Sequence, residues 1–195
     1  MLRAGSLIDG RFEIEGELGR GGTATVFLAR DRQMMGERVA LKVLHPHLGN
    51  DDALRARLGR EILACRSLSH PNILPVYELP NVDGYVFLSM AYHRGRNLSE
   101  RLGESGPMSI EEVRALGLAL SSALQAAHLK GILHRDIKPQ HVLISDDGAA
   151  QLVDFGLARI EQLGTLVGKE GVIGTAGYVP PEVLVGEGWE PRGDL

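Results

Sequence analysis

Two aspartates in the second half of the sequence lie at predicted loop positions, where carboxylates can take part in catalysis. Asp136 lies in the stretch His134–Pro139, directly after a long segment with helical periodicity. Asp154 follows a short apolar segment and opens the tripeptide Asp-Phe-Gly. Such loop carboxylates can serve as a general base toward a hydroxyl group and as a ligand of a divalent metal ion. Each aspartate taken alone is more often a turn or cap residue.

A lysine and a glutamate occupy positions that the apolar pattern marks as buried. Lys42 lies in Val-Ala-Leu-Lys-Val-Leu, and Glu61 falls on the apolar stripe of a predicted helix, one residue before Ile62. A buried charge needs a partner of opposite sign. The pattern therefore predicts that Lys42 pairs with Glu61, and it leaves open the alternative of two separate solvated charges.

A glycine-rich loop precedes this lysine. Gly19, Gly21 and Gly22 lie between two predicted strands, where glycines let backbone amides approach phosphate groups. An ordinary glycine-rich hairpin has the same composition. The loop lacks the Gly-Lys-Ser/Thr ending of a P-loop, and a strand follows it, which excludes P-loop and Rossmann interpretations.

The elements that position these residues change in character along the chain. Short runs rich in Val, Leu, Phe and Tyr predict strands at Phe12–Leu18, Thr25–Arg30, Glu37–Leu44, Ile73–Leu79 and Tyr85–Met90, and later at Val142–Ile144 and Gln151–Val153. Helical spacing predicts helices at Asp51–Leu68 and Ser109–Lys130. Ser109 and Glu112 form a capping box at the start of the second helix. A strand-rich part followed by a helix-rich part predicts two lobes joined near Ala91–Gly95.

Composition limits the classes of function. The 195 residues carry a net charge of −4, which does not favour nucleic-acid binding. The single cysteine, Cys65, excludes an internal disulfide framework and is typical of a reducing compartment. No apolar run reaches the roughly 18 residues of a spanning helix. We expect a cytoplasmic chain, and a membrane anchor beyond Leu195 is left open.

The order of these motifs resembles the signature set of the protein kinase family. The motifs follow one another in the order glycine loop, Val-Ala-Leu-Lys, helix glutamate, His-Arg-Asp, Asp-Phe-Gly and Pro180-Pro181-Glu182. The match to the family runs from about Phe12 to Leu195. Its details are closest to the bacterial serine/threonine branch. The resemblance implies an α+β, two-lobed fold, with a strand-rich N-lobe at residues 1–91 that holds one helix and an incomplete helical C-lobe at residues 92–195.

The resemblance also implies an ATP site. Its adenine-binding and hinge positions are Leu18, Val26, Ala40, Met90 as the gatekeeper, Ala91 through its carbonyl and His93 through its amide. Its phosphate-binding positions are Gly19, Gly21, Gly22 and Lys42, with Glu61 fixing Lys42.

Catalysis and substrate class follow from the same resemblance. Asp136 is implied as the base that receives the substrate hydroxyl proton, and Asp154 as a ligand of Mg²⁺, with Mn²⁺ as an alternative. Lys138, two residues after Asp136, is typical of kinases that modify serine and threonine. The implied partners are ATP and protein substrates.

Regulation is implied between Asp154 and Glu182. Thr175 resembles the threonine that braces Asp136 and Lys138. Thr165 is the remaining hydroxyl residue before Tyr178, so we expect phosphorylation there, with Arg135 pairing the phosphate. The alternative is that Thr165 is a plain loop residue.

Departures from the family pattern leave a rival function open. Ala24 replaces the third glycine of the loop, and Pro180 replaces an alanine; both changes are mild. His141 stands where the family has asparagine, a ligand of the second Mg²⁺, so His141 is a metal ligand, an indirect ligand through water, or only a hydrogen-bonding group. We expect weakened metal binding. The rival is a pseudokinase-like module that binds nucleotide or a partner without turnover.

The end of the sequence also departs from the family. Asp194 resembles the aspartate that opens the central helix of the large lobe and binds the His-Arg-Asp backbone. We therefore expect a fragment in which the helix Ser109–Lys130 lacks a packing partner and leaves apolar surface uncovered.

Overall fold

The chain forms two compact units. The computed structural model describes residues 2–46, 59, 60, 62–82, 84–155 and 176–195. The first unit comprises residues 1–66 and 75–92, and the second comprises residues 67–74 and 93–195. Residues 67–74 belong to the second unit because the Leu74 amide donates to the Leu152 carbonyl at 2.9 Å and the Asn72 side chain donates to the Ala150 carbonyl at 2.8 Å. The predicted boundary after residue 91 did not place residues 67–74 in the second unit.

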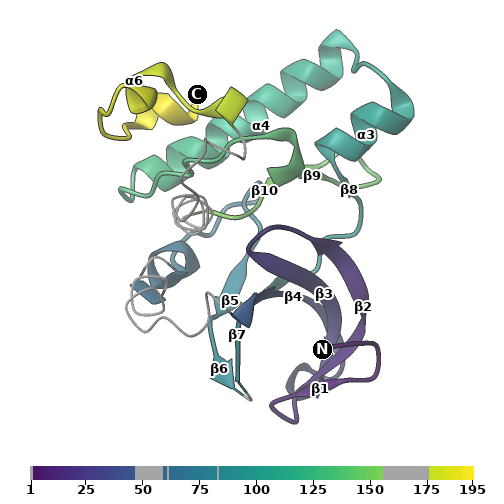
Figure 1. Ribbon diagram of the computed structural model, residues 1–195. Helices are drawn as coiled ribbons and strands as arrows, with labels where there is room; N and C mark the ends of the chain where they lie inside the picture. Colours follow the sequence, from purple (N-terminus) through teal and green to yellow (C-terminus); the bar gives the residue numbers. More distant parts are fainter. Residues whose placement is uncertain (1, 47–58, 61, 83, 156–175) are drawn as a thin grey trace. The chain divides into compact units, whose positions relative to one another are not determined.

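An antiparallel sheet makes up most of the first unit (Figure 1). Its strands follow the order β1-β2-β3-β4-β7-β5, and β6 pairs with β7. The strands are β1 (Leu7–Ile8), β2 (Phe12–Arg20), β3 (Ala24–Asp31), β4 (Glu37–Leu44), β5 (Val76–Glu78), β6 (Asn81–Val82) and β7 (Tyr85–Ala91). The short 3-10 helix η1 (Arg32–Met34) connects β3 to β4.

One face of this sheet carries the apolar core. Phe12 and Phe87 meet edge to face, with ring centroids 5.4 Å apart. The remaining core residues are Ile8, Ile14, Phe27, Ala29, Val39, Leu41 and Val43. Burying such side chains stabilises the sheet by roughly 1.5–3 kcal/mol each for the larger ones.

A partly buried ion pair joins Arg11, directly before β2, to Asp31 at the end of β3. The Arg11 guanidinium donates to both carboxylate oxygens of Asp31, at 2.8 and 2.6 Å, and to Glu78 at 2.7 Å. The hydrogen bonds from Arg11 lower the pKa of the Asp31 carboxyl, although burial opposes the shift. The sheet is therefore fixed at this end by a carboxylate that stays ionised.

The second unit is built on two helices and a small sheet. The helices are α3 (Leu98–Ser105) and α4 (Ile110–His128), and both begin with a complete capping box, Asn97 with Glu100 and Ser109 with Glu112. The sheet order is β10-β9-β8, with β8 (Arg96–Asn97), β9 (Val142–Ile144) and β10 (Ala150–Leu152). The short elements η2 (Pro139–His141), η3 (Ala176–Tyr178), α6 (Pro181–Leu184) and η4 (Pro191–Asp194) complete the unit.

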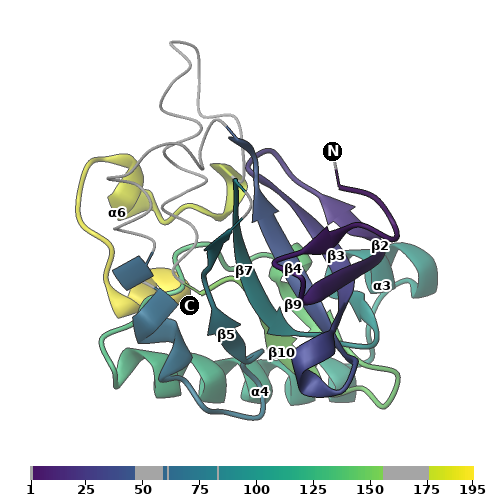
Figure 2. The ribbon, with the colours of Figure 1, turned by 90° about the horizontal axis from the view of Figure 1, so that it is seen from below.

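Helix α4 packs one face against β10 (Figure 2). Ala123, Leu124 and Ala127 are buried on that face. By contrast, Ile110, Val113 and Leu118 are exposed. Apolar surface on this helix is thus uncovered, as the sequence predicted.

Gly95 is needed where β8 begins. Its φ is +142°, and a Cβ added there would lie 2.2 Å from the Ile144 carbonyl oxygen. Only glycine fits this close approach of two backbones. The β8–β9 pairing therefore depends on this residue.

Several predicted elements have different limits in the structure. The strand expected at Ile73–Leu79 contracts to β5, because Pro75 has no amide and Ile73 makes only a single bridge to Leu152. The first predicted helix begins outside the described residues; residues 59, 60 and 62–66 are helical, and Ser67 forms a turn instead of continuing to Leu68. Helix α4 ends two residues early, at His128, because Gly131 turns back with φ +70°.

Candidate active site

The expected nucleotide-binding residues of the first unit share one face of its sheet. In an antiparallel sheet, directly opposed residues lie on the same face. Val26 is opposite Lys42, and Ala40 is opposite Met90. Since Ala40 and Lys42 are two residues apart, all four side chains lie on one face, and Gly19 joins them through its pairing with Val26. The core residues Leu41 and Val43 alternate with them and lie on the opposite face.

The glycines of the loop are not required by the fold. At Gly19 and Gly22, an added Cβ would meet nothing within 4 Å, and at Gly21 it would meet only the Ala24 carbonyl oxygen at 3.7 Å. None of the three has a positive φ. Their lack of a side chain therefore leaves the loop backbone accessible, which is what a phosphate-binding loop needs.

The glycine loop is held by His45, a histidine that no sequence motif marks. The His45 Nδ1 atom donates to the Gly22 carbonyl at 3.1 Å, and the Thr25 hydroxyl donates to Nε2 at 3.3 Å. The backbone amide of His45 also donates to the Thr23 carbonyl at 2.9 Å. His45 directly follows β4 and lies three residues after Lys42, so these hydrogen bonds connect the end of that strand to the glycine loop.

Lys42 is buried as predicted, with 8% of its surface exposed. Its expected partner Glu61 lies outside the described residues, as do Gly156, Thr165 and Thr175. Leu18, in contrast, is 47% exposed. Ala91 and His93 are both half-buried.

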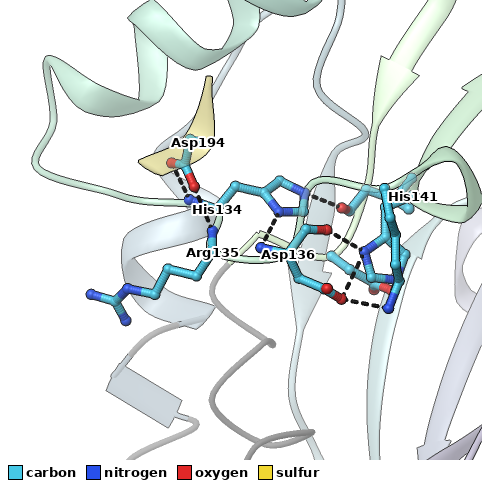
Figure 3. A network of polar contacts seen from close by, with 8 residues as sticks. His134, Arg135, Asp136, His141 and Asp194 are labelled. Carbon is cyan, nitrogen blue, oxygen red and sulfur yellow. Dashed lines mark hydrogen bonds and ion pairs between the residues drawn. The ribbon is translucent and has the colours of Figure 1, made fainter. Parts of the chain in front are cut away.

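The His-Arg-Asp loop of the second unit is held by Asp194 (Figure 3). The amides of His134 and Arg135 donate to the two carboxylate oxygens of Asp194 at 2.8 and 2.7 Å. The His128 Nε2 atom, at the end of α4, donates to the same carboxylate at 2.8 Å. Asp194 is 3% exposed. The expected contact of Asp194 with this backbone is confirmed, whereas no sequence motif indicated the role of His128.

The backbone is strained at one residue of the His-Arg-Asp motif and one residue of the Asp-Phe-Gly motif. Arg135 and Asp154 have φ values of +68° and +67°, in the left-handed region that side chains other than glycine rarely adopt. Such strain persists where surrounding contacts enforce it, and it is common at functional sites. The Asp194 hydrogen bond to the Arg135 amide is one such contact.

The ring of His134 is neutral and supports the loop through hydrogen bonds of both its nitrogens. Its Nε2 atom donates to the Val153 carbonyl at 2.8 Å, so Nδ1 is the acceptor for the Asp136 amide at 3.3 Å. Complete burial, together with the nearby His141, lowers the pKa of His134 to about 4. Its ring also meets Phe155 edge to face at 4.7 Å. His134 therefore connects the segments that carry Asp136 and Asp154.

The Asp136 carboxylate is in contact with two cationic or polar partners. Oδ2 lies 2.6 Å from the Lys138 Nζ atom and 3.2 Å from the His141 Nδ1 atom. The Asp136 side chain is largely buried. The structure thus brings together three of the predicted catalytic and metal-binding residues.

Asp154 completes the group through His141. The His141 Nε2 atom lies 3.4 Å from the Asp154 Oδ2 atom. Asp154, with its carboxylate oxygens, fits Mg²⁺, whereas the imidazole nitrogen of His141 does not, because Mg²⁺ prefers oxygen ligands. Among the described residues, no group of three or more His, Cys, Asp or Glu side chains could hold a metal ion.

Comparisons with known proteins agree with this geometry. The sequence model described as the protein kinase domain matches residues 12–195. The probable serine/threonine-protein kinase PknB of Bifidobacterium longum is 34% identical over 97% of this chain, and the serine/threonine-protein kinase PrkC of Bacillus subtilis is 35% identical over 91%. The chain spans only 29% and 27% of these relatives' lengths.

A solved structure shows the same fold. The kinase domain of PknI from Mycobacterium tuberculosis matches all of this chain and 71% of its own chain, with 29% identity and a TM-score of 0.78. The expected kinase-like fold, with a strand-rich first part and a helical second part, is confirmed.

Proposed function

The chain belongs to the protein kinase family, and from this premise we propose that the protein containing it transfers the γ-phosphoryl group of ATP to serine or threonine hydroxyls of other proteins. The observation that supports this most is the position of Asp136, whose loop backbone is anchored on Asp194 and whose carboxylate lies 2.6 Å from Lys138. A carboxylate fixed in this way can accept a hydrogen bond from the substrate hydroxyl and receive its proton as the oxygen attacks the γ-phosphorus.

Lys138 would stabilise the negative charge of the phosphoryl group during its transfer. When the new oxygen–phosphorus bond forms and the bond to the β-phosphate oxygen breaks, negative charge lies on the transferred group, and an adjacent ammonium stabilises it. By its resemblance to the family, Lys138 also favours serine and threonine over tyrosine as the acceptor.

The nucleotide would lie against the sheet face that carries Val26, Ala40, Lys42 and Met90. Ala40 and Met90, with Val26 and Leu18, supply apolar surface for adenine, and the carbonyl of Ala91 and the amide of His93 supply hydrogen bonds. Lys42, fixed by Glu61, would hold the α- and β-phosphates, and the backbone of Gly19, Gly21 and Gly22 would cover the phosphates.

Asp154 would hold the metal ion, for which we propose Mg²⁺ with Mn²⁺ as an alternative. Bound there, the ion neutralises charge on the β- and γ-phosphates. Asp154 is oriented for this by its left-handed backbone and by the strand β10 that precedes it.

Regulation and location are further parts of the proposal. Phosphate on Thr165 would pair with Arg135, and Thr175 would brace Asp136 and Lys138. The single, buried cysteine Cys65 and the need for ATP favour a cytoplasmic location of this part of the protein. Among the described helices, none has the length and apolar character needed to cross a membrane.

His141 favours a second candidate function. With a nitrogen ligand in place of an amide oxygen, the domain could hold nucleotide or a partner protein without turnover. Transfer of ³²P from γ-labelled ATP by the full-length protein, followed by phosphoamino-acid analysis, separates the two. We expect phosphoserine or phosphothreonine. Nucleotide binding without any transfer, with either Mg²⁺ or Mn²⁺, would support the binding module instead.

A further inference from the structure

The glycine loop ends in a tight turn whose tip is bound to His45. The Gly21 amide donates to the Ala24 carbonyl at 2.9 Å and closes the turn, so Gly22 and Thr23 form its tip. Both tip carbonyls accept hydrogen bonds from His45, the Gly22 carbonyl from ring Nδ1 at 3.1 Å and the Thr23 carbonyl from the backbone amide at 2.9 Å. His45 therefore fixes the direction of two successive peptide groups.

The ring contacts of His45 hold whether the imidazole is neutral or charged. A carbonyl oxygen only accepts hydrogen bonds, so Nδ1 carries a proton where it contacts Gly22. The Thr25 hydroxyl, 3.3 Å from Nε2, can donate to a neutral ring or accept from a charged one. Thr25 is 6% exposed, so this second contact holds the ring against a buried side chain.

The direction of the Gly22 carbonyl also sets the direction of the Thr23 amide. No cis peptide bond occurs among the described residues. In a planar trans peptide the C=O group and the following N–H group point in opposite directions. With its carbonyl turned toward His45, the peptide between Gly22 and Thr23 presents its amide on the opposite side. Gly22 is exposed and Thr23 is only half-buried, so a ligand can reach this amide.

We propose that His45 is a positioning residue for the phosphates of a bound nucleotide. It turns the Gly22 carbonyl, which would repel a phosphate oxygen, away from the ligand and so directs the Thr23 amide toward that oxygen. A loop that is already held in this conformation loses less conformational freedom on binding, which raises the affinity. The proposal deepens the proposed function, on which it rests for its ligand, and it confines the effect of His45 to ligands that carry phosphate.

Calorimetric titration of the full-length protein with ATP, ADP and adenosine, in the presence of Mg²⁺, tests this role. Leucine and asparagine branch alike at Cγ, but only the asparagine amide can donate from the position that Nδ1 occupies. His45→Leu should weaken the binding of ATP and ADP about three- to tenfold, the usual effect of one hydrogen bond, and leave adenosine affinity within about twofold. His45→Asn should keep ATP and ADP affinities within about twofold of the wild type.

Gln33→Leu is the matched control. Gln33 is exposed in η1, at the opposite end of the same two strands, and its hydrogen bond to Asp31 uses the backbone amide. This variant should leave all three affinities unchanged. Unchanged ADP affinity in His45→Leu, or an equal loss of ADP and adenosine affinity, overturns the proposal. So does an ADP affinity of His45→Asn as low as that of His45→Leu.

A measurement on the wild type needs no variant. In protein labelled with ¹⁵N-threonine, the amide resonance of Thr23 should shift when ADP is added and stay in place with adenosine. A Thr23 resonance that ignores ADP overturns the proposal even if His45→Leu does not fold. Nucleotide binding that depends on His45, without any phosphoryl transfer, contradicts only the proposed function. Phosphoryl transfer by a protein whose His45→Leu variant binds ADP normally contradicts only this inference.

Discussion

The buried His134 makes the stability of the second unit depend on pH. Its pKa is about 4 in the folded protein, against 6.5 in an unfolded chain. Between these values the unfolded chain binds more protons, so the free energy of unfolding falls as the pH falls from 6.5 toward 4 and changes no further from this source below pH 4. The full difference corresponds to about 3 kcal/mol, of which about 2 kcal/mol is already lost at pH 5.

Urea unfolding at pH 7, 6 and 5 measures this loss. The fluorescence of Trp189, the single tryptophan of the chain, reports on the same unit. His134→Phe should flatten the pH dependence in this range, although it destabilises the unit by about 1–3 kcal/mol for each hydrogen bond it removes, to the Val153 carbonyl and from the Asp136 amide. A wild type whose stability is the same at pH 7 and pH 5 would refute the reasoning.

Three further predictions concern the first unit and the segment after Asp154. Lys42→Met should abolish phosphoryl transfer and weaken ATP binding, while Glu61→Gln should impair transfer less because it does not touch phosphate; unchanged turnover of Lys42→Met would rule out the assignment. Asp31→Asn should lower the free energy of unfolding by about 2 kcal/mol, since it breaks the pair of the buried Asp31 carboxylate with the partly exposed Arg11, whereas Glu15→Gln, at the surface, should cost less than about 1 kcal/mol in the same denaturation experiment. Mass spectrometry of the full-length protein after incubation with ATP should find phosphate on Thr165, and a bare Thr165 beside other phosphosites rejects that role.

The sequence predicted the first unit well where runs rich in Val, Leu, Phe and Tyr are long. Strands β2, β3 and β4 are long enough for that pattern to be read, and the capping box at Ser109 marked the start of α4. Helix α3 was missed because it is eight residues long and buries none of them. Two-residue strands such as β1 and β8 carry no pattern at all.

The chemistry of the site could be read from local motifs, but its supports could not. Asp136, Lys138 and Asp154 lie in short sequences with a recognisable order. The contact of His128 with Asp194 joins residues 66 positions apart, and that of His45 with Thr25 depends on the register of β3 and β4. Only the packed backbone brings such pairs together. In His141, the sequence showed the departure from the family, and the structure added the orientation of its two nitrogens.

The central claim is that Asp136 accepts the proton of the substrate hydroxyl, and one variant tests it most directly. Asp136→Asn in the full-length protein keeps the size of the side chain but removes the base. We predict a fall in kcat of about 10²–10⁴-fold with an unchanged Kd for ATP, because the nucleotide is held by other residues. An Asp136→Asn protein with undiminished kcat, or one that loses ATP affinity while keeping its rate, would contradict the account.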